Sequence, residues 1–146
     1  MAWLREDPDL KGALTRHWCA EVNVIVAVKA AAWDSPSFEG IGFHGYERIL
    51  DEDASTRQVF YAKDDARLHR VGEATVKNAQ HDKAYLYEFS GAGPCEINGT
   101  GDNPRTKIEF KPFVRYAGDV VRWENVHENH SLAYGDSWSR KADILE

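Results

Sequence analysis

The chain has 146 residues and a formal net charge of −6, with 18 Lys and Arg scattered among 24 Asp and Glu. This length suits a single domain, 1–146, and the scattered basic residues argue against a phosphate-tracking surface, so we expect no nucleic-acid partner. No uninterrupted apolar run is long enough for a membrane span, and the first residues lack a secretory pattern. We therefore expect a cytoplasmic protein that makes no membrane contact.

The first predicted element is a helix over about residues 8–20. Asp7 can cap its N-terminus and Pro8 suits its first position. Apolar side chains then recur every four positions from Leu10 to Trp18, which is the spacing of one helix face.

The next segment, 21–32, has two interpretations. Its β-branched run from Val22 to Val28 favours a strand, and we prefer a helix followed by a strand. The helical spacing also continues through the alanines, which gives one helix over 8–32. That alternative predicts an α+β cone, in which a long N-terminal helix packs on a strongly bent antiparallel sheet.

From residue 36 onward the pattern is typical of antiparallel β structure, with apolar and β-branched runs separated by turn-forming clusters. Trp138, close to the C-terminus, indicates that the tail packs on the body as a final strand or an ordered segment. The expected strands cover 38–50, 56–63, 67–78, 84–89, 105–116 and 120–129. Because such a sheet must close or double over to protect its edges, we predict a mainly β single-domain antiparallel barrel of seven to eight strands with one N-terminal helix.

The segment 105–116 divides into two rows of side chains, because successive residues of a strand point to opposite faces. Its even-numbered row is apolar and includes Phe110, which we expect to contact a substrate. Its odd-numbered row is almost wholly charged and must face water. Pro112 cannot donate a ladder hydrogen bond, so we expect an edge, a kink or a bulge there, and an exposed edge permits a homodimer.

The stretch RWENVHENH, residues 122–130, divides in the same way. We expect Trp123, Asn125 and His127 to point inward, where Trp123 and Asn125 bind a substrate and His127 acts as an acid or base. The charged even-numbered row then faces solvent. His127 and His130 lie an odd number of residues apart and cannot hold one ion on a regular strand, so we expect neither a metal nor a cofactor.

Two further strands supply candidate site residues. His44 and Tyr46 lie beside glycines, which leave room either for a ligand or for a neighbouring aromatic ring. We take His44 as a second catalytic candidate and Tyr46 as a substrate-binding one, and we interpret the strand glycines as marks of bulges or bends. Tyr85 and Tyr87 share one row, and their phenols suit either a hydrogen-bonded core or a small-molecule pocket.

These residues support two hypotheses about function. The first is a barrel that binds a small apolar or aromatic molecule in an aromatic-lined pocket, with isomerase, cyclase or lyase activity as an extension. The second is an acidic protein-interaction module without catalytic activity, which would bind a basic or mixed-charge partner. A filled interior favours the module, and a closed cavity favours the pocket.

Overall fold

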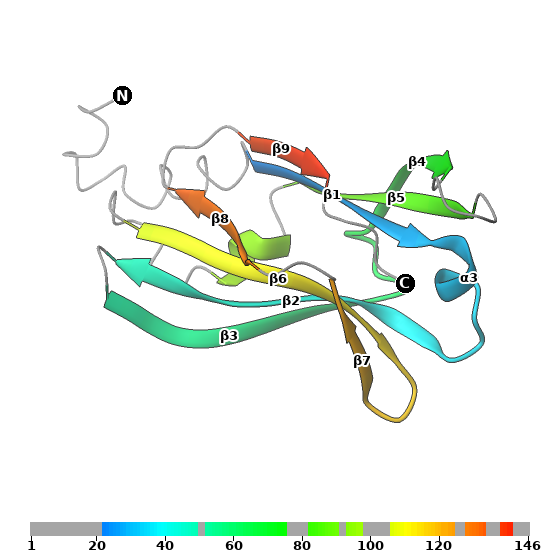
Figure 1. Ribbon diagram of the computed structural model, residues 1–146, viewed down its shortest axis with the longest axis horizontal. Coiled ribbons are helices and arrows are strands. Elements are labelled where there is room, and N and C mark those ends of the chain that lie inside the picture. The colour runs from blue at the N-terminus through cyan, green and yellow to red at the C-terminus, as the bar shows by residue number, and fades with distance from the viewer. Residues whose placement is uncertain are drawn as a thin grey trace.

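The computed structural model describes residues 22–49, 52–75, 82–90, 93–97, 106–124, 128–133 and 138–141 (Figure 1). Strands dominate the described chain, which confirms the prediction of a mainly β protein. In chain order the elements are β1 (Val22–Lys29), α3 (Ala30–Trp33), β2 (Phe38–Ile49), β3 (Glu52–Ala62), β4 (His69–Thr75), β5 (Lys83–Ser90), the 3-10 helix η2 (Gly93–Ile97), β6 (Thr106–Tyr116), β7 (Val120–Trp123), β8 (His130–Ala133) and β9 (Trp138–Lys141).

The segment after residue 21 begins with a strand, as the preferred interpretation has it, so the alternative of one helix over 8–32 is wrong. β1 buries alternate valines, from Val24 to Val28, and a β-branched run of this kind packs better in a pleated sheet than on a helix. Helix α3 is a single turn of four residues. The predicted helix over 8–20 lies outside the described residues. Among the residues described, no helix has the length and apolar character needed to cross a membrane.

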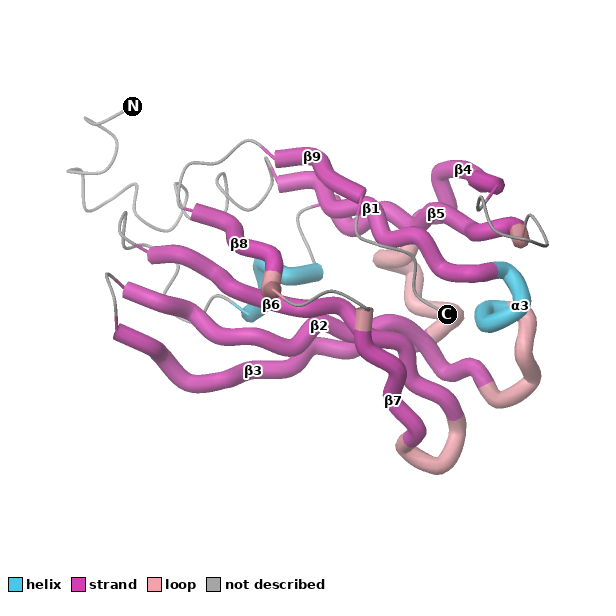
Figure 2. The backbone as a smooth tube through the Cα atoms, in the orientation of Figure 1, coloured by secondary structure: helices cyan, strands magenta, loops and turns pink. Residues whose placement is uncertain are grey.

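The strands form two sheets that are not closed into a barrel, which corrects that prediction (Figure 2). One sheet has the order β4-β5-β1-β9, and the other has the order β3-β2-β6-β7, with β8 also paired to β6. The chain changes sheet at α3, between β1 and β2, and again between β3 and β4, between β5 and β6, and between β8 and β9. β9 lies parallel to β1, so the tail does pack as a strand, as Trp138 suggested.

The core lies between the two sheets and is built from the inward rows of both. β1 and β5 contribute valines and aromatic rings, and β2, β6 and β8 face them with isoleucines, phenylalanines and a leucine. Phe43 sits near the centre, with ring centroids 5.0 Å from Phe89, 5.8 Å from Phe110 and 6.3 Å from Tyr61, all edge to face. This packing fills the described interior with aromatic side chains.

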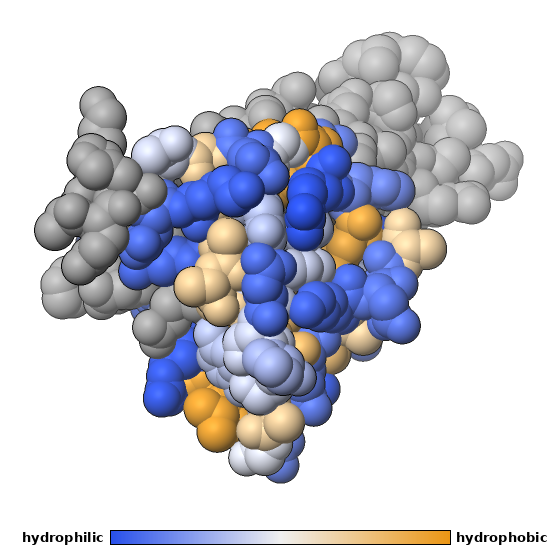
Figure 3. Space-filling model, turned by 90° about the vertical axis from the view of Figure 1, so that its right-hand side faces the viewer, coloured by the Kyte–Doolittle hydropathy of each residue, from blue (hydrophilic) through white to orange (hydrophobic). Residues whose placement is uncertain are grey.

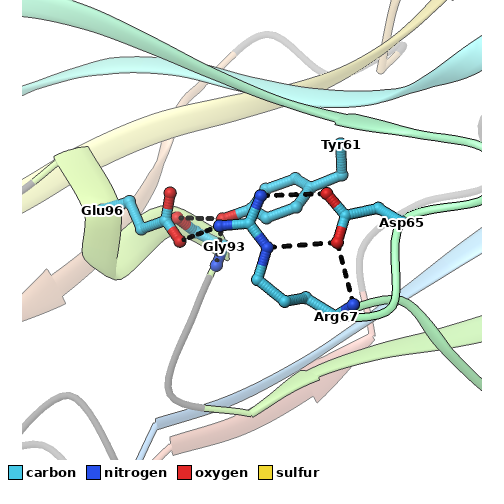
Figure 4. A network of polar contacts seen from close by, with 5 residues as sticks. All are labelled: Tyr61, Asp65, Arg67, Gly93 and Glu96. Atoms are coloured by element: carbon cyan, nitrogen blue, oxygen red, sulfur yellow. Dashed lines mark hydrogen bonds and ion pairs between the residues drawn. The ribbon is translucent and has the colours of Figure 1, made fainter.

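Helix η2 covers one part of this core and is fastened to β3 by polar contacts (Figure 4). The buried Tyr61 hydroxyl accepts a 2.7 Å hydrogen bond from the Gly93 amide. Arg67 lies over the Tyr61 ring at 4.7 Å and joins Asp65 to Glu96, each at 2.9 Å. Burial raises the pKa of the Tyr61 phenol well above its usual range, because the phenolate would lose its hydration.

β6 is an interior strand, so the prediction of an exposed edge at Pro112 is wrong. It pairs with β2 on one side and with β7 and then β8 on the other. The register with β2 runs through Pro112 without the bulge that was the other expectation, but the ladder on the opposite side of β6 stops there. The Glu124 amide donates to the Pro112 carbonyl at 3.0 Å, but the proline has no N–H to return the bond. β7 therefore ends at Trp123, and β8 resumes pairing opposite Phe110.

Candidate functional site

The candidate site lies on the surface of the five-stranded sheet that points away from the core, which we call the outer face. The antiparallel register pairs Gly42 of β2 with Phe113 of β6, and His44 with Lys111. Because paired residues of neighbouring strands share a face, the odd-numbered row of β6 and the even-numbered row of β2 meet here.

An aromatic cluster occupies the centre of the outer face. Phe113 is only 1% exposed, although it belongs to the charged row of its strand. Its ring lies over Gly42, where an added Cβ would come within 2.1 Å of the ring. The glycine beside His44 therefore makes room for a neighbouring aromatic side chain, which was one of the two alternatives at this position.

Trp123 stands on this cluster and is the large aromatic side chain most open to solvent among the described residues. Its ring centroid is 5.0 Å from Phe113 and 5.5 Å from His44. Even so, Trp123 remains 46% exposed. An indole held by two rings on one side and open to water on the other is a preformed contact surface.

Charged side chains surround the aromatic cluster. Arg115 lies 3.7 Å over the Phe60 ring and pairs with Glu39 at 2.8 Å. Arg48 pairs with Glu109 at 3.3 Å and donates a 2.9 Å hydrogen bond to the Tyr46 hydroxyl. The basic residues that reach this face are Arg48, Lys107, Lys111 and Arg115, and the acidic residues are Glu39 and Glu109. Among the described side chains on this face, basic residues thus outnumber acidic ones, although the chain as a whole is acidic, and Arg48, Lys107 and Arg115 form ion pairs with the two glutamates.

Three of the predicted site residues, His44, Tyr46 and Trp123, come together on the outer face. Asn125 and His127 lie outside the described residues, so their predicted roles stay predictions. The other three predicted residues do not join this group, because their side chains lie between the sheets: these are Tyr85, Tyr87 and Phe110.

The prediction that Trp123 points inward is wrong. Trp123 pairs with Phe113, an outer-face residue of β6, and so it points the same way. Its neighbour Glu124, expected in solvent, is 2% exposed. The apolar Phe113 in an otherwise charged row was the sequence signal for an aromatic outer face.

Sequence reasoning missed a buried polar pair on the inner side of the same sheet. His130 Nε2 lies 2.6 Å from Glu124 Oε1, and the two side chains are 6% and 0% exposed. His130 also lies against Phe110, with a centroid distance of 5.4 Å. Their shared even-numbered row was visible in the sequence, but the row was expected to face water. The pair ties β8 to the end of β7.

No known protein-family model matches this chain, and no curated protein matches it at a significant level. Within the described residues, no three His, Cys, Asp or Glu side chains gather as metal ligands would. The geometry of the outer face is therefore the basis on which a function is inferred.

Proposed function

We propose that this protein is a binding domain that holds a partner protein against its outer face. The observation that carries this proposal is the position of Trp123, which is supported by Phe113 and His44 and is 46% exposed. Tryptophan is enriched among the residues that dominate binding energy at protein interfaces. Covering its free side would add apolar burial without any rearrangement of the sheet.

The charge around Trp123 favours an acidic partner. Lys111 and Arg115 flank Phe113 along β6, and Lys107 lies further along the same row. These side chains would steer an acidic segment toward the tryptophan and would do so less at high salt. This differs from the basic or mixed-charge partner expected from the net charge of the chain, because basic residues outnumber acidic ones among the described side chains around the aromatic cluster.

The packed interior supports a surface site over an enclosed one. The aromatic-lined pocket required space among Tyr85, Tyr87 and Phe110. In the described core, Phe110 contacts Phe43 at 5.8 Å, and Tyr87 stacks on Trp33 at 4.1 Å. Contacts this close leave no room for an apolar substrate between Phe43 and Phe110 or between Trp33 and Tyr87.

Two short synthetic peptides of equal length would test the proposal by isothermal titration calorimetry. One alternates glutamate with serine around a central phenylalanine, and the other has lysine in place of each glutamate. We expect the glutamate peptide to bind, more weakly as salt is raised, and the lysine peptide not to bind. Trp123→Ala should weaken binding about 30-fold, which corresponds to about 2 kcal/mol.

Val120→Ala is the matched control. Val120 lies on the same strand, is 40% exposed, and stands opposite Tyr116, on the other row from Trp123. This variant should bind the glutamate peptide as the unmodified protein does. Equal binding of the two peptides, or equal effects of the two substitutions, would contradict the proposed site.

A further inference from the structure

A second group of side chains, at the end of the molecule that carries α3, surrounds the guanidinium of Arg70. It comprises Trp33, Tyr85 and Tyr87, with Asp34 beside them, and we call it the cage. Figure 3 views the molecule from this end, where strongly hydrophilic residues border a central strip of near-neutral hydropathy. The cage is separate from the outer face and does not depend on the function proposed for it.

The contacts in the cage are those of a cation-recognition site. The Arg70 Cζ atom lies 3.8 Å from the Tyr85 ring centroid, 5.3 Å from that of Tyr87 and 6.0 Å from that of Trp33. Its Nε donates a 3.0 Å hydrogen bond to the Tyr87 hydroxyl, and Nη2 donates to the same oxygen. Several ring faces around one cation, with a hydrogen-bond acceptor in reach, are how proteins hold organic cations.

The walls of the cage are also held by contacts that do not involve Arg70. Tyr87 stacks on Trp33 with centroids 4.1 Å apart and ring planes at 22°. The Tyr85 hydroxyl donates a 2.8 Å hydrogen bond to Asp34, which fixes that ring and brings a carboxylate close to the cation. All three aromatic residues are under 9% exposed. A site prepared in this way would not have to reorganise to accept another guanidinium.

β4, the strand that carries Arg70, is held less firmly than the residues of the cage. β4 is at the edge of its sheet and, within the described chain, pairs only with β5. Its residues are all exposed or half-buried. The pairing shifts register between Arg70 and Gly72, and this irregularity sets Arg70 opposite Tyr87. An exposed edge strand opens locally more readily than the core behind it.

We propose that the cage is a guanidinium-binding site and that Arg70 is its built-in occupant. When β4 moves away, an arginine group from another molecule takes the place of Arg70, either as free arginine or as a side chain of a polypeptide. The exchange leaves the charge at the site unchanged, which matters because Lys63 and Lys83 already lie 5.7 Å from Trp33 and 5.6 Å from Tyr85. The planar stacking on Tyr85 and the paired hydrogen bonds select a guanidinium over an ammonium group.

Removing the occupant tests this directly. Arg70→Ala removes the side chain that occupies the cage. Binding of N-acetyl-L-arginine amide and of free L-arginine to this variant is then measured from changes in the NMR signals of the Tyr85 and Tyr87 rings. We expect at least one of these compounds to bind the variant ten-fold or more tightly than the unmodified protein, where Arg70 competes. Binding of the amide alone assigns the ligand to a polypeptide, and binding of free arginine alone assigns it to a small molecule.

Arg115→Ala is the matched control, because its guanidinium also covers a ring, that of Phe60 at 3.7 Å, but lies outside the cage. It should leave both affinities unchanged. Arg70→Gln serves if the alanine variant does not fold, since the shorter side chain keeps part of the apolar stem but leaves the place of the guanidinium over Tyr85 empty. The proposal is overturned if the folded Arg70 variants bind neither compound more tightly, or if N-acetyl-L-lysine amide binds them equally well.

Discussion

Gly45 lies where strands β2 and β6 leave no space for a side chain. A Cβ added there would come within 1.9 Å of the Glu109 carbonyl oxygen and 2.7 Å of the Phe110 Cα. Both are backbone atoms, so the strands would have to separate to admit a methyl group. We expect Gly45→Ala to lower the free energy of unfolding by about 3 kcal/mol, measured by urea denaturation.

Gly72 provides the control for this substitution, because the nearest atom to its added Cβ is Leu86 Cδ1 at 3.8 Å. Gly72→Ala should be neutral or stabilising by about 0.5 kcal/mol, since alanine restricts the unfolded chain. Similar losses in the two variants would mean that backbone crowding is not the reason for glycine at position 45.

The sequence shows which strand positions are glycine, but it does not show why each of them has to be glycine. The interpretation as bulges or bends is confirmed at Gly40, which lies beside a register shift. Gly42 instead makes room for the Phe113 ring, and Gly45 makes room for the backbone of β6. Such close approaches depend on which strand pairs alongside, and no local pattern contains that information.

At the scale of elements, β6 was predictable and its partners were not. Its apolar row is buried from Ile108 to Val114 because one register with β2 runs from Thr106 to Arg115. The sequence predicts that the segment after β6 is one strand over 120–129. On β6 the last residue paired with β7 is Phe113 and the first residue paired with β8 is Phe110. On the segment that follows β6, their partners are Trp123 and His130, which lie much further apart. Pro112 explains the interruption, but the sequence did not show that it lay opposite Glu124.

The pair of Glu124 and His130 secures the two ends of this interruption, and its removal should be costly. Both side chains are buried, with 2.6 Å between Nε2 and Oε1. We expect Glu124→Ala to lower the free energy of unfolding by about 3 kcal/mol, because a buried polar group loses its partner. Glu124→Gln, which keeps a hydrogen-bonding group of the same size, should lose less. Urea denaturation measures both.

Glu73→Ala is the matched control for this experiment. Glu73 pairs with Lys83 at 3.5 Å, but both side chains are more than half exposed. Its loss should cost less than about 1 kcal/mol, as for other solvent-exposed ion pairs. A loss at Glu124 as small as that at Glu73 would contradict a structural role for the buried pair.

At the scale of the whole molecule, the prediction of a barrel was wrong because closure depends on pairings between distant segments. β1 pairs with β5 and β9, whereas β2, the next strand along the chain, belongs to the other sheet. Hydrophobic alternation defines which face of a strand is buried and is the same for a barrel and for two packed sheets. The mainly β character and the buried row of β6 were therefore accessible from sequence, whereas the nine strands of the described chain exceed the seven to eight predicted, and their partition between sheets was not accessible.

The two-sheet arrangement makes β9 the cover for the edge of β1. The four residues Trp138–Lys141 pair in parallel with the first half of β1. Deleting residues 138–146 would expose the backbone of an apolar strand, and an unprotected edge of this kind recruits other chains. We expect this deletion to lower the melting temperature and to cause concentration-dependent association in sedimentation velocity experiments. Deletion of 142–146 retains β9 and should remain as monodisperse as the full chain. A stable, non-associating product of the longer deletion would show that β9 does not protect this edge.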